Sequence, residues 1–159
     1  MNKIIPKNIA LLGSTGSIGE NCLRVVSEHP KHFRILYLSA HSNSRRLSEQ
    51  CDIFKPKAAI ITNPLKFKED RKLFKKPFPI LSGPESLLAL FQDPEVDLVV
   101  NAIVGGAGVF PTYHALHSGK AVALANKESL VVAGQLIMKM VKEKKLTLLP
   151  IDSEHSAIF

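Results

Sequence analysis

Glycine and hydroxyl residues gather in one short stretch near the start of the chain. Gly13, Gly16 and Gly19 recur every third position in GSTGSIG, after an apolar run and before a segment of helical period. Glycines at such a turn let backbone N–H groups and the helix N-terminus face a pyrophosphate. Thr15 and Ser17 add hydroxyl donors. The pattern favours a dinucleotide phosphate site, and the alternative is an ordinary strand–helix turn with Ser17 as the N-cap.

The charges that follow the second apolar run bear on the kind of dinucleotide. An NAD site usually places a carboxylate about 20 residues after the glycine loop, yet no Asp or Glu occurs between Glu28 and Glu49. Arg45 and Arg46 stand there instead, and they would attract the 2′-phosphate that distinguishes NADP. We therefore predict NADP(H) rather than NAD(H); the alternative is that both arginines lie on an exposed helix start.

A pair of carboxylates near the end of the chain could hold a metal. Asp152 and Glu154 are two residues apart, so they share one face if the preceding strand continues through them. Paired oxygen ligands suit Mg2+ or Mn2+. The alternative is that Asp152 or Ser153 caps a following helix, with Glu154 in its first turn. The residues alone slightly favour this capping interpretation.

Asn126 and Lys127 follow another apolar run. Lys127 could place a cation beside a phosphate or a carbonyl, and Asn126 could bond a nicotinamide or a ribose. Asn126 is equally a good N-cap for the helix expected to end at Val141, and capping is the favoured interpretation. For His114, His117 and His155 we expect ordinary packing or exposure rather than metal binding.

Each of these stretches follows an apolar run of strand length. The runs are residues 8–12, 34–40, 57–62, 97–103, 120–125 and 146–151, and helical periods occupy 17–29, 43–54, 85–91 and 128–141. Continuous apolar runs are typical of strands buried on both faces of a parallel sheet. The alternation predicts an α/β fold, a Rossmann-like, doubly wound, mostly parallel sheet, with one helix and a short edge element in 64–82. Ligands of such sheets bind at the carboxyl ends of the strands, where one edge could collect all these groups.

Length and composition exclude several classes of protein. The 159 residues suit one domain, and 45% hydrophobic with 22% charged residues is the usual globular mixture. The longest apolar stretch has 13 residues, too short to span a membrane. Residues 55–76 contain eight basic and two acidic residues and so carry most of the net charge of +7. Because the chain has no Trp to stack on bases, we favour a solvated helix face over a nucleic-acid site for this segment. We interpret Cys22 and Cys51 as reduced thiols on buried helix faces. We also expect the protein to be cytoplasmic.

Four motifs together resemble the 1-deoxy-D-xylulose 5-phosphate reductoisomerase family. They are LLGSTGSIG (11–19), NAIVGGAG (101–108), LANKESLV (124–131) and PIDSEHSAIF (150–159). The resemblance implies an NADPH-binding domain at 1–151 and the beginning of a truncated catalytic domain at 152–159, in an enzyme that forms homodimers. It also implies rearrangement and reduction of a sugar phosphate, 1-deoxy-D-xylulose 5-phosphate, to 2-C-methyl-D-erythritol 4-phosphate, with NADPH and Mg2+, Mn2+ or Co2+, in non-mevalonate isoprenoid biosynthesis.

The resemblance also implies residue roles. With the glycine pattern, it assigns cofactor contacts to Gly13, Thr15, Gly16, Ser17, Ile18, Gly19, Asn43, Asn126 and Glu128. Asp152 and Glu154 would bind the metal and act in catalysis with Lys127, and Lys127, Ser153 and Glu154 would contact the substrate. Many members have AGKN where this chain has AHSN at 40–43, so only Asn43 transfers. The third metal carboxylate, the substrate-phosphate residues and a lid are expected beyond Phe159. Alternatives are another NADP-dependent sugar-phosphate dehydrogenase or a non-catalytic nucleotide- or nucleic-acid-binding module.

Overall fold

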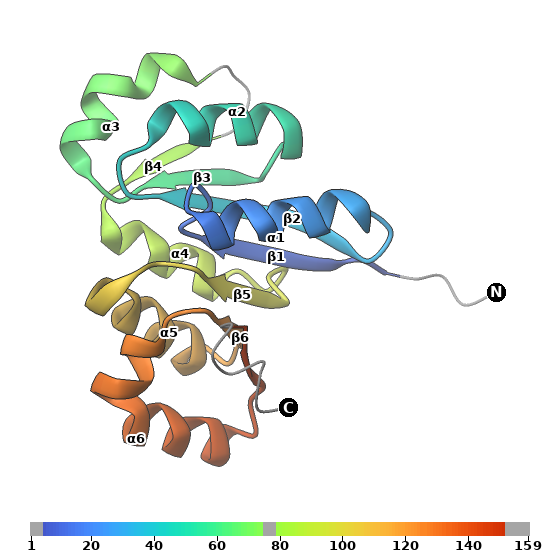
Figure 1. The fold of residues 1–159 in the computed structure, drawn as a ribbon, viewed down its shortest axis with the longest axis vertical. Coiled ribbons are helices and arrows are strands. Elements are labelled where there is room, and N and C mark those ends of the chain that lie inside the picture. The colour runs from blue at the N-terminus through green and yellow to red at the C-terminus, as the bar shows by residue number, and fades with distance from the viewer. Residues whose placement is uncertain (1–4, 75–78, 152–159) are drawn as a thin grey trace.

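The computed structural model describes residues 5–74 and 79–151, and these form one seven-stranded parallel sheet (Figure 1). The strands are β1 (Lys7–Leu12), β2 (Phe33–Ala40), β3 (Ala58–Ile61), β4 (Ile80–Ser82), β5 (Leu98–Asn101), β6 (Ala121–Leu124) and β7 (Leu148–Pro150). Their order is β4-β3-β2-β1-β5-β6-β7, and every neighbouring pair is parallel. The strand order therefore reverses between β1 and β5, which is where such sheets open a ligand crevice.

Helices connect the strands, as the sequence predicts. They are α1 (Ser17–Glu28), α2 (Ser44–Phe54), α3 (Pro64–Asp70), α4 (Leu87–Gln92), α5 (Val109–His117) and α6 (Lys127–Lys144), with 3-10 turns at Arg71–Leu73, Pro84–Ser86 and Gly105–Gly108. The segment 64–82 holds one helix, α3, and the edge strand β4, which confirms the expectation for it. The fifth strand is shorter than its apolar run, because the chain leaves the sheet after Asn101.

The two faces of the sheet carry separate apolar cores. Successive strand residues point to opposite faces, so Ile9 and Leu11 pack with α1 and α2, while Ala10 and Leu12 pack with α4, α5 and α6. Figure 1 shows α1 and α2 together on one side of the strands. Helices on both faces make the sheet doubly wound, which confirms the predicted fold class. All four of these β1 residues are at most 3% exposed, so the strand that leads into the glycine loop is held from both sides.

Asparagine side chains begin three of the helices. Asn43 accepts a hydrogen bond from the Arg46 N–H at 3.2 Å, Asn63 accepts from Leu65 at 3.0 Å, and Asn126 accepts from Ser129 at 2.7 Å. In α1, by contrast, Gly16 is the N-cap residue and gives no side-chain cap. The alternative in which Ser17 caps this helix is therefore wrong, because Ser17 is already its first residue.

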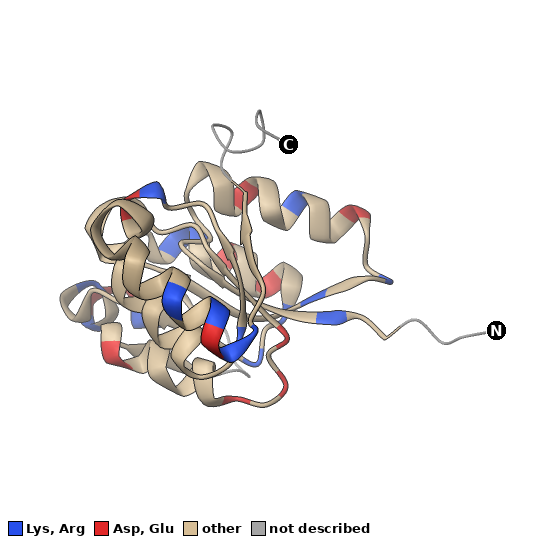
Figure 2. Cartoon of the chain, turned by 90° about the horizontal axis from the view of Figure 1, so that it is seen from below, with Lys and Arg blue, Asp and Glu red and all other residues tan. Residues whose placement is uncertain are grey.

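Most of the basic segment lies on the surface. Lys66, Lys68, Arg71 and Lys72 are exposed on α3 and the turn after it. Lys66 donates to Glu69 at 2.6 Å. Figure 2 shows basic and acidic positions interleaved over several helices and loops. The exposure of these residues agrees with the prediction of a solvated face. Within residues 5–74 and 79–151, no helix is long and apolar enough to cross a membrane.

Candidate functional site

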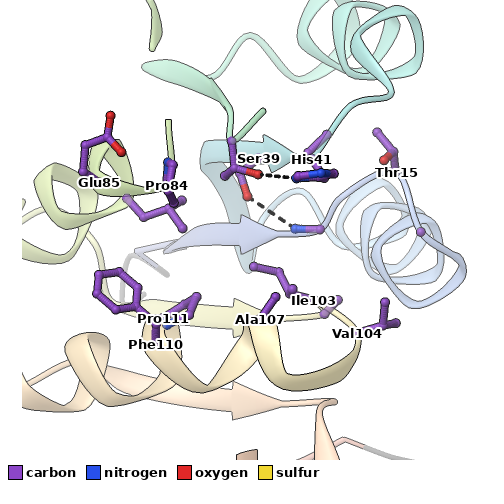
Figure 3. A pocket seen from close by; sticks show the side chains of 16 residues that line it. Thr15, Ser39, His41, Pro84, Glu85, Ile103, Val104, Ala107, Phe110 and Pro111 are labelled. Carbon is purple, nitrogen blue, oxygen red and sulfur yellow. Dashed lines mark hydrogen bonds between the residues drawn. The ribbon is translucent and has the colours of Figure 1, made fainter. Parts of the chain in front are cut away.

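A cavity of about 790 Å3 lies at the carboxyl ends of β1, β2, β3, β4 and β5. Its lining residues are Gly13, Thr15, Gly16, Ser39, Ala40, His41, Thr62, Pro84, Glu85, Leu87, Ala102, Ile103, Val104, Ala107, Phe110 and Pro111. Figure 3 shows the glycine-loop residue Thr15 and His41 at one end, with Pro84 and Glu85 opposite Phe110 and Pro111. The cavity thus joins a polar loop to largely apolar walls, at the edge that the sequence predicts.

Two of the three glycines are required by the packing of the loop itself. Gly13 has φ +74°, and a Cβ there would lie 2.8 Å from the Ala102 carbonyl oxygen. A Cβ at Gly19 would lie 2.4 Å from the Gly13 carbonyl oxygen. At Gly16 the nearest such atom is 3.5 Å away, and this residue is exposed to the cavity. The packing of the loop therefore does not itself require glycine at position 16.

The predicted cofactor residues Ser17, Ile18 and Gly19 form the first turn of α1. The first N–H groups of a helix have no partner within the helix, and among the described residues no side chain caps this end. The helix dipole adds partial positive charge at the same place. An anion at the loop would therefore meet unpaired donors and a favourable field.

The polar residues after β2 are divided between the cavity and α2. His41 lines the cavity, and its Nδ1 lies 3.1 Å from the Thr62 hydroxyl. Asn43, a predicted cofactor residue, is exposed and uses its side-chain oxygen to cap α2. Arg45 is exposed. Carboxylates of α1 and α2 bind the guanidinium of Arg46, whose side chain remains 44% exposed.

Asn126 uses its whole side chain within the protein. Its oxygen accepts from the Ser129 N–H and hydroxyl, both at 2.7 Å, and its Nδ2 donates to the carbonyls of Ile103 at 2.5 Å and Gly105 at 2.7 Å. The capping interpretation is confirmed. The same amide also joins the start of α6 to the loop after β5 that forms a wall of the cavity. A side-chain contact to a cofactor would have to replace one of these bonds.

Two of the remaining predicted residues, Lys127 and Glu128, lie further along the edge. Lys127 is exposed and Glu128 is half-buried in the first turn of α6, beside β6, and neither lines the cavity. Asp152, Ser153 and Glu154, with His155, lie outside the described residues. In the described part of the chain, no group of three or more His, Cys, Asp or Glu side chains is placed to hold a metal.

The two described histidines of α5 take part in ring packing. The His114 ring lies 4.2 Å from that of Phe110, and His117 stacks on Tyr113 at 5.8 Å, between centroids. These contacts agree with the packing role predicted for both histidines.

Sequence reasoning missed the buried amide of Asn101 at the end of β5. Its Nδ2 donates to the Gly108 carbonyl and the Thr112 hydroxyl, both at 2.8 Å, and its oxygen accepts from the Ile103 N–H at 3.1 Å. The signal that could have found it is one amide within an otherwise apolar strand, because a buried amide needs partners. Glu85 and Phe110 were missed as lining residues since neither lies in a motif.

A glycine-rich loop facing a largely apolar cavity, at the point where the order of a doubly wound sheet reverses, defines a nucleotide-binding domain of the Rossmann type. The sequence profile of the 1-deoxy-D-xylulose 5-phosphate reductoisomerase family matches residues 9–134. The chain belongs to this family, as the four motifs predict.

Individual relatives agree with this assignment. A reductoisomerase of Bacteroides fragilis is 42% identical over 160 residues, covering 100% of this chain and 41% of that protein. The reductoisomerase of Zymomonas mobilis in complex with NADPH is 35% identical with a TM-score of 0.90, covering 98% of this chain and 41% of that one. A reductoisomerase complex with NADPH, fosmidomycin and magnesium has 41% identity and a TM-score of 0.87, covering 96% and 38%. This chain therefore spans less than half the length of each.

Proposed function

We propose that this chain is the NADPH-binding part of a 1-deoxy-D-xylulose 5-phosphate reductoisomerase. One observation carries the proposal: the glycine loop of a family member opens onto a cavity of about 790 Å3 at the switch point of the sheet. The domain would occupy 1–151, and 152–159 would begin a catalytic domain. The protein would act in the cytoplasm as a homodimer in non-mevalonate isoprenoid biosynthesis, with a sugar phosphate as its substrate and neither a membrane nor a nucleic acid as a partner.

The described residues fit a dinucleotide. The N–H groups of Ser17, Ile18 and Gly19 would receive its phosphates, since no described side chain caps them. Thr15 would donate a hydroxyl from the cavity wall. Gly13 and Gly19 would keep the loop tight, and Gly16 would let the phosphates approach the backbone.

The choice of NADPH over NADH would fall to the residues after β2. Arg45 and Asn43 are exposed there, His41 lines the cavity, and no carboxylate occurs in the segment 29–48 to repel a 2′-phosphate. Asn126 and Glu128 would border the nicotinamide end from β6 and α6. The bound cofactor supplies the hydride, and the protein supplies position and electrostatics.

The rearrangement step would depend on residues at the end of this chain. Asp152 and Glu154 would be two ligands of Mg2+, Mn2+ or Co2+, which stabilises oxyanion charge on a substrate carbonyl or hydroxyl. Lys127 and Ser153 would contact the substrate together with Glu154. In a full-length enzyme, Asp152→Asn should abolish metal-dependent activity and leave the affinity for NADPH nearly unchanged. A large loss of NADPH binding would instead support the capping role of Asp152.

Calorimetric titration of the 159-residue chain with NADPH tests the proposal. We expect weak binding, with NADPH favoured over NADH, and no turnover, because the third metal carboxylate and the lid would lie in the rest of the enzyme. Gly16→Thr is the matched variant. Thr caps a helix about as well as Gly does, so its stability should be unchanged, but its side chain would occupy the phosphate site and abolish binding. Equal binding by the variant, or turnover by the chain, would contradict the proposal.

A further inference from the structure

The buried side-chain amide of Gln50 in α2 forms hydrogen bonds with Ser14 of the glycine loop. The Ser14 side chain is 0% exposed, and its hydroxyl donates to Gln50 Oε1 at 2.7 Å. Gln50, itself 1% exposed, returns a hydrogen bond from Nε2 to the Ser14 carbonyl at 2.9 Å. The Ser14 N–H is bound as well, to the Ser39 carbonyl at 2.8 Å. The N–H, carbonyl and hydroxyl of Ser14 are thus all fixed, directly before the cavity residues Thr15 and Gly16.

An ion pair fixes the orientation of that amide. Gln50 Nε2 also donates to Glu20 Oε1 at 2.9 Å, and Glu20 lies in the first turn of α1. Arg46 binds both oxygens of the Glu20 carboxylate, through Nε at 2.6 Å and Nη2 at 2.8 Å, and donates to Glu49 at 2.8 Å through Nη1. Hydrogen bonds from Arg46, opposed by partial burial, hold the pKa of Glu20 below its ordinary value. The carboxylate therefore remains an acceptor for Gln50.

We infer that Gln50 is a positioning residue for the cofactor phosphates, held in place by the Glu20–Arg46 pair. This inference rests on the proposed function. A loop whose shape is fixed before binding loses less conformational entropy when the ligand arrives, so the affinity for any pyrophosphate ligand rises. Arg46, which the sequence offered as a contact for the 2′-phosphate, instead supports the loop through Glu20 and Gln50. Removing the Arg46 side chain should then weaken the binding of NADPH and of NADH equally, because both ligands carry the pyrophosphate.

Three ligands separate this role from a direct contact. Adenosine 2′-monophosphate carries the 2′-phosphate but no pyrophosphate, and NADH carries the reverse combination. For Gln50→Met in the 159-residue chain, we expect the Kd of NADPH and of NADH to rise by the same factor, about tenfold, the equivalent of one hydrogen bond. For Arg46→Ala the two Kd values should again rise equally but by only about threefold, because the Arg46–Glu20 pair is partly exposed and acts through Gln50. The Kd of adenosine 2′-monophosphate should change by less than about twofold, which is within the context dependence of such contacts.

Every other pattern overturns the inference. Weaker binding of NADPH and adenosine 2′-monophosphate, with the binding of NADH unchanged, would make Arg46 a direct contact of the 2′-phosphate. Equal weakening of all three ligands would indicate general loss of structure, and no change would remove any role. Arg45→Ala is the matched control, because it removes the same charge from the neighbouring exposed position. Its proposed place near the 2′-phosphate predicts weaker binding of NADPH and adenosine 2′-monophosphate with the binding of NADH unchanged. An equal loss of NADPH and NADH binding in this variant would instead assign the effect to surface charge.

A measurement without ligand keeps the inference separate from the proposed function. If the unaltered chain binds no dinucleotide, the proposed function fails. In that case amide hydrogen exchange still tests the network: the N–H groups of Ser14 and Gly16, bonded to Ser39 and Gly13, should exchange faster in both variants than in the unaltered chain. Unchanged exchange would show that Gln50 and Arg46 do not fix the loop.

Discussion

Gly19→Ala should destabilise the protein although the residue lies in a helix, where Ala is normally preferred. The added Cβ would lie 2.4 Å from the Gly13 carbonyl oxygen and 2.6 Å from Ser14 backbone atoms. Helix propensity contributes about 1 kcal/mol in favour of Ala. Forcing a methyl group into closed space costs about 1–3 kcal/mol and more where rigid groups must move, and these neighbours are backbone. We expect a net loss of about 2 kcal/mol, which lowers Tm by about 4–8 °C in a domain of this size.

Gly134→Ala is the matched control for this variant. Gly134 lies in α6 directly after a kink at Ala133, and nothing would lie within 4 Å of its Cβ. Because the added methyl group meets no neighbour, it should change the free energy of unfolding by less than about 1 kcal/mol in either direction. Thermal unfolding followed by circular dichroism compares the two. A loss of stability at Gly134 as large as that at Gly19 would refute the claim that the close approach of the loop to α1 requires glycine at position 19.

Three further predictions concern the polar groups and thiols of the core. Asn126→Ala should lower the free energy of unfolding, measured in urea, by about 2–4 kcal/mol, because it removes a helix cap and leaves two carbonyls without a donor. Asn126→Asp keeps the oxygen that caps the helix and should recover only part of the lost stability. Equal stability of the two variants would contradict the reasoning. Burial raises the pKa of Asp93, but donors from Lys57 and Tyr37 outweigh it and hold the pKa at about 2, below the ordinary 3.8. A pKa below the unfolded value stabilises the fold at higher pH, so this stabilisation should be lost as the pH falls from 3.8 through 2. Because Lys57 is 47% exposed, water screens the pair and the loss should be about 1 kcal/mol. Asp93→Asn should flatten that part of the stability curve; an unchanged curve would show that the ion pair contributes nothing. Burial raises the pKa of the Cys51 thiol to about 12, so iodoacetamide at about pH 8 should alkylate it only after unfolding; rapid labelling of the native chain would refute this.

The sheet was predictable because most of its strands are continuous apolar runs in the sequence. Residues 58–61 contain no polar side chain and residues 35–40 contain only Tyr37 and Ser39, and both stretches are buried in the structure. The glycine loop and the Asn126 cap were predictable for a related reason, since each follows from local backbone geometry. The end of β5 was placed two residues late, because the apolar residues Ala102 and Ile103 serve the cavity wall rather than the sheet.

The rest of the site depends on contacts between residues far apart in the chain. Arg46 looked available to a ligand because nothing near it in sequence reveals Glu20, which is 26 positions away. Glu85 and Phe110 line the cavity only because the connections after β4 and β5 cross to the same edge. Such positions follow from how the elements pack, and no spacing along the chain encodes them.

The central place of β1 has a consequence for protein synthesis. β1 pairs with β2, which follows closely, and with β5, whose first residue is Leu98. Gly13 packs against Ala102. The glycine loop therefore leaves the ribosome well before Ala102, and its packing is completed only after some 90 further residues have emerged. Until then β1 has one neighbour and an open edge, so a pause in translation before β5 leaves the nascent sheet most exposed to mispairing.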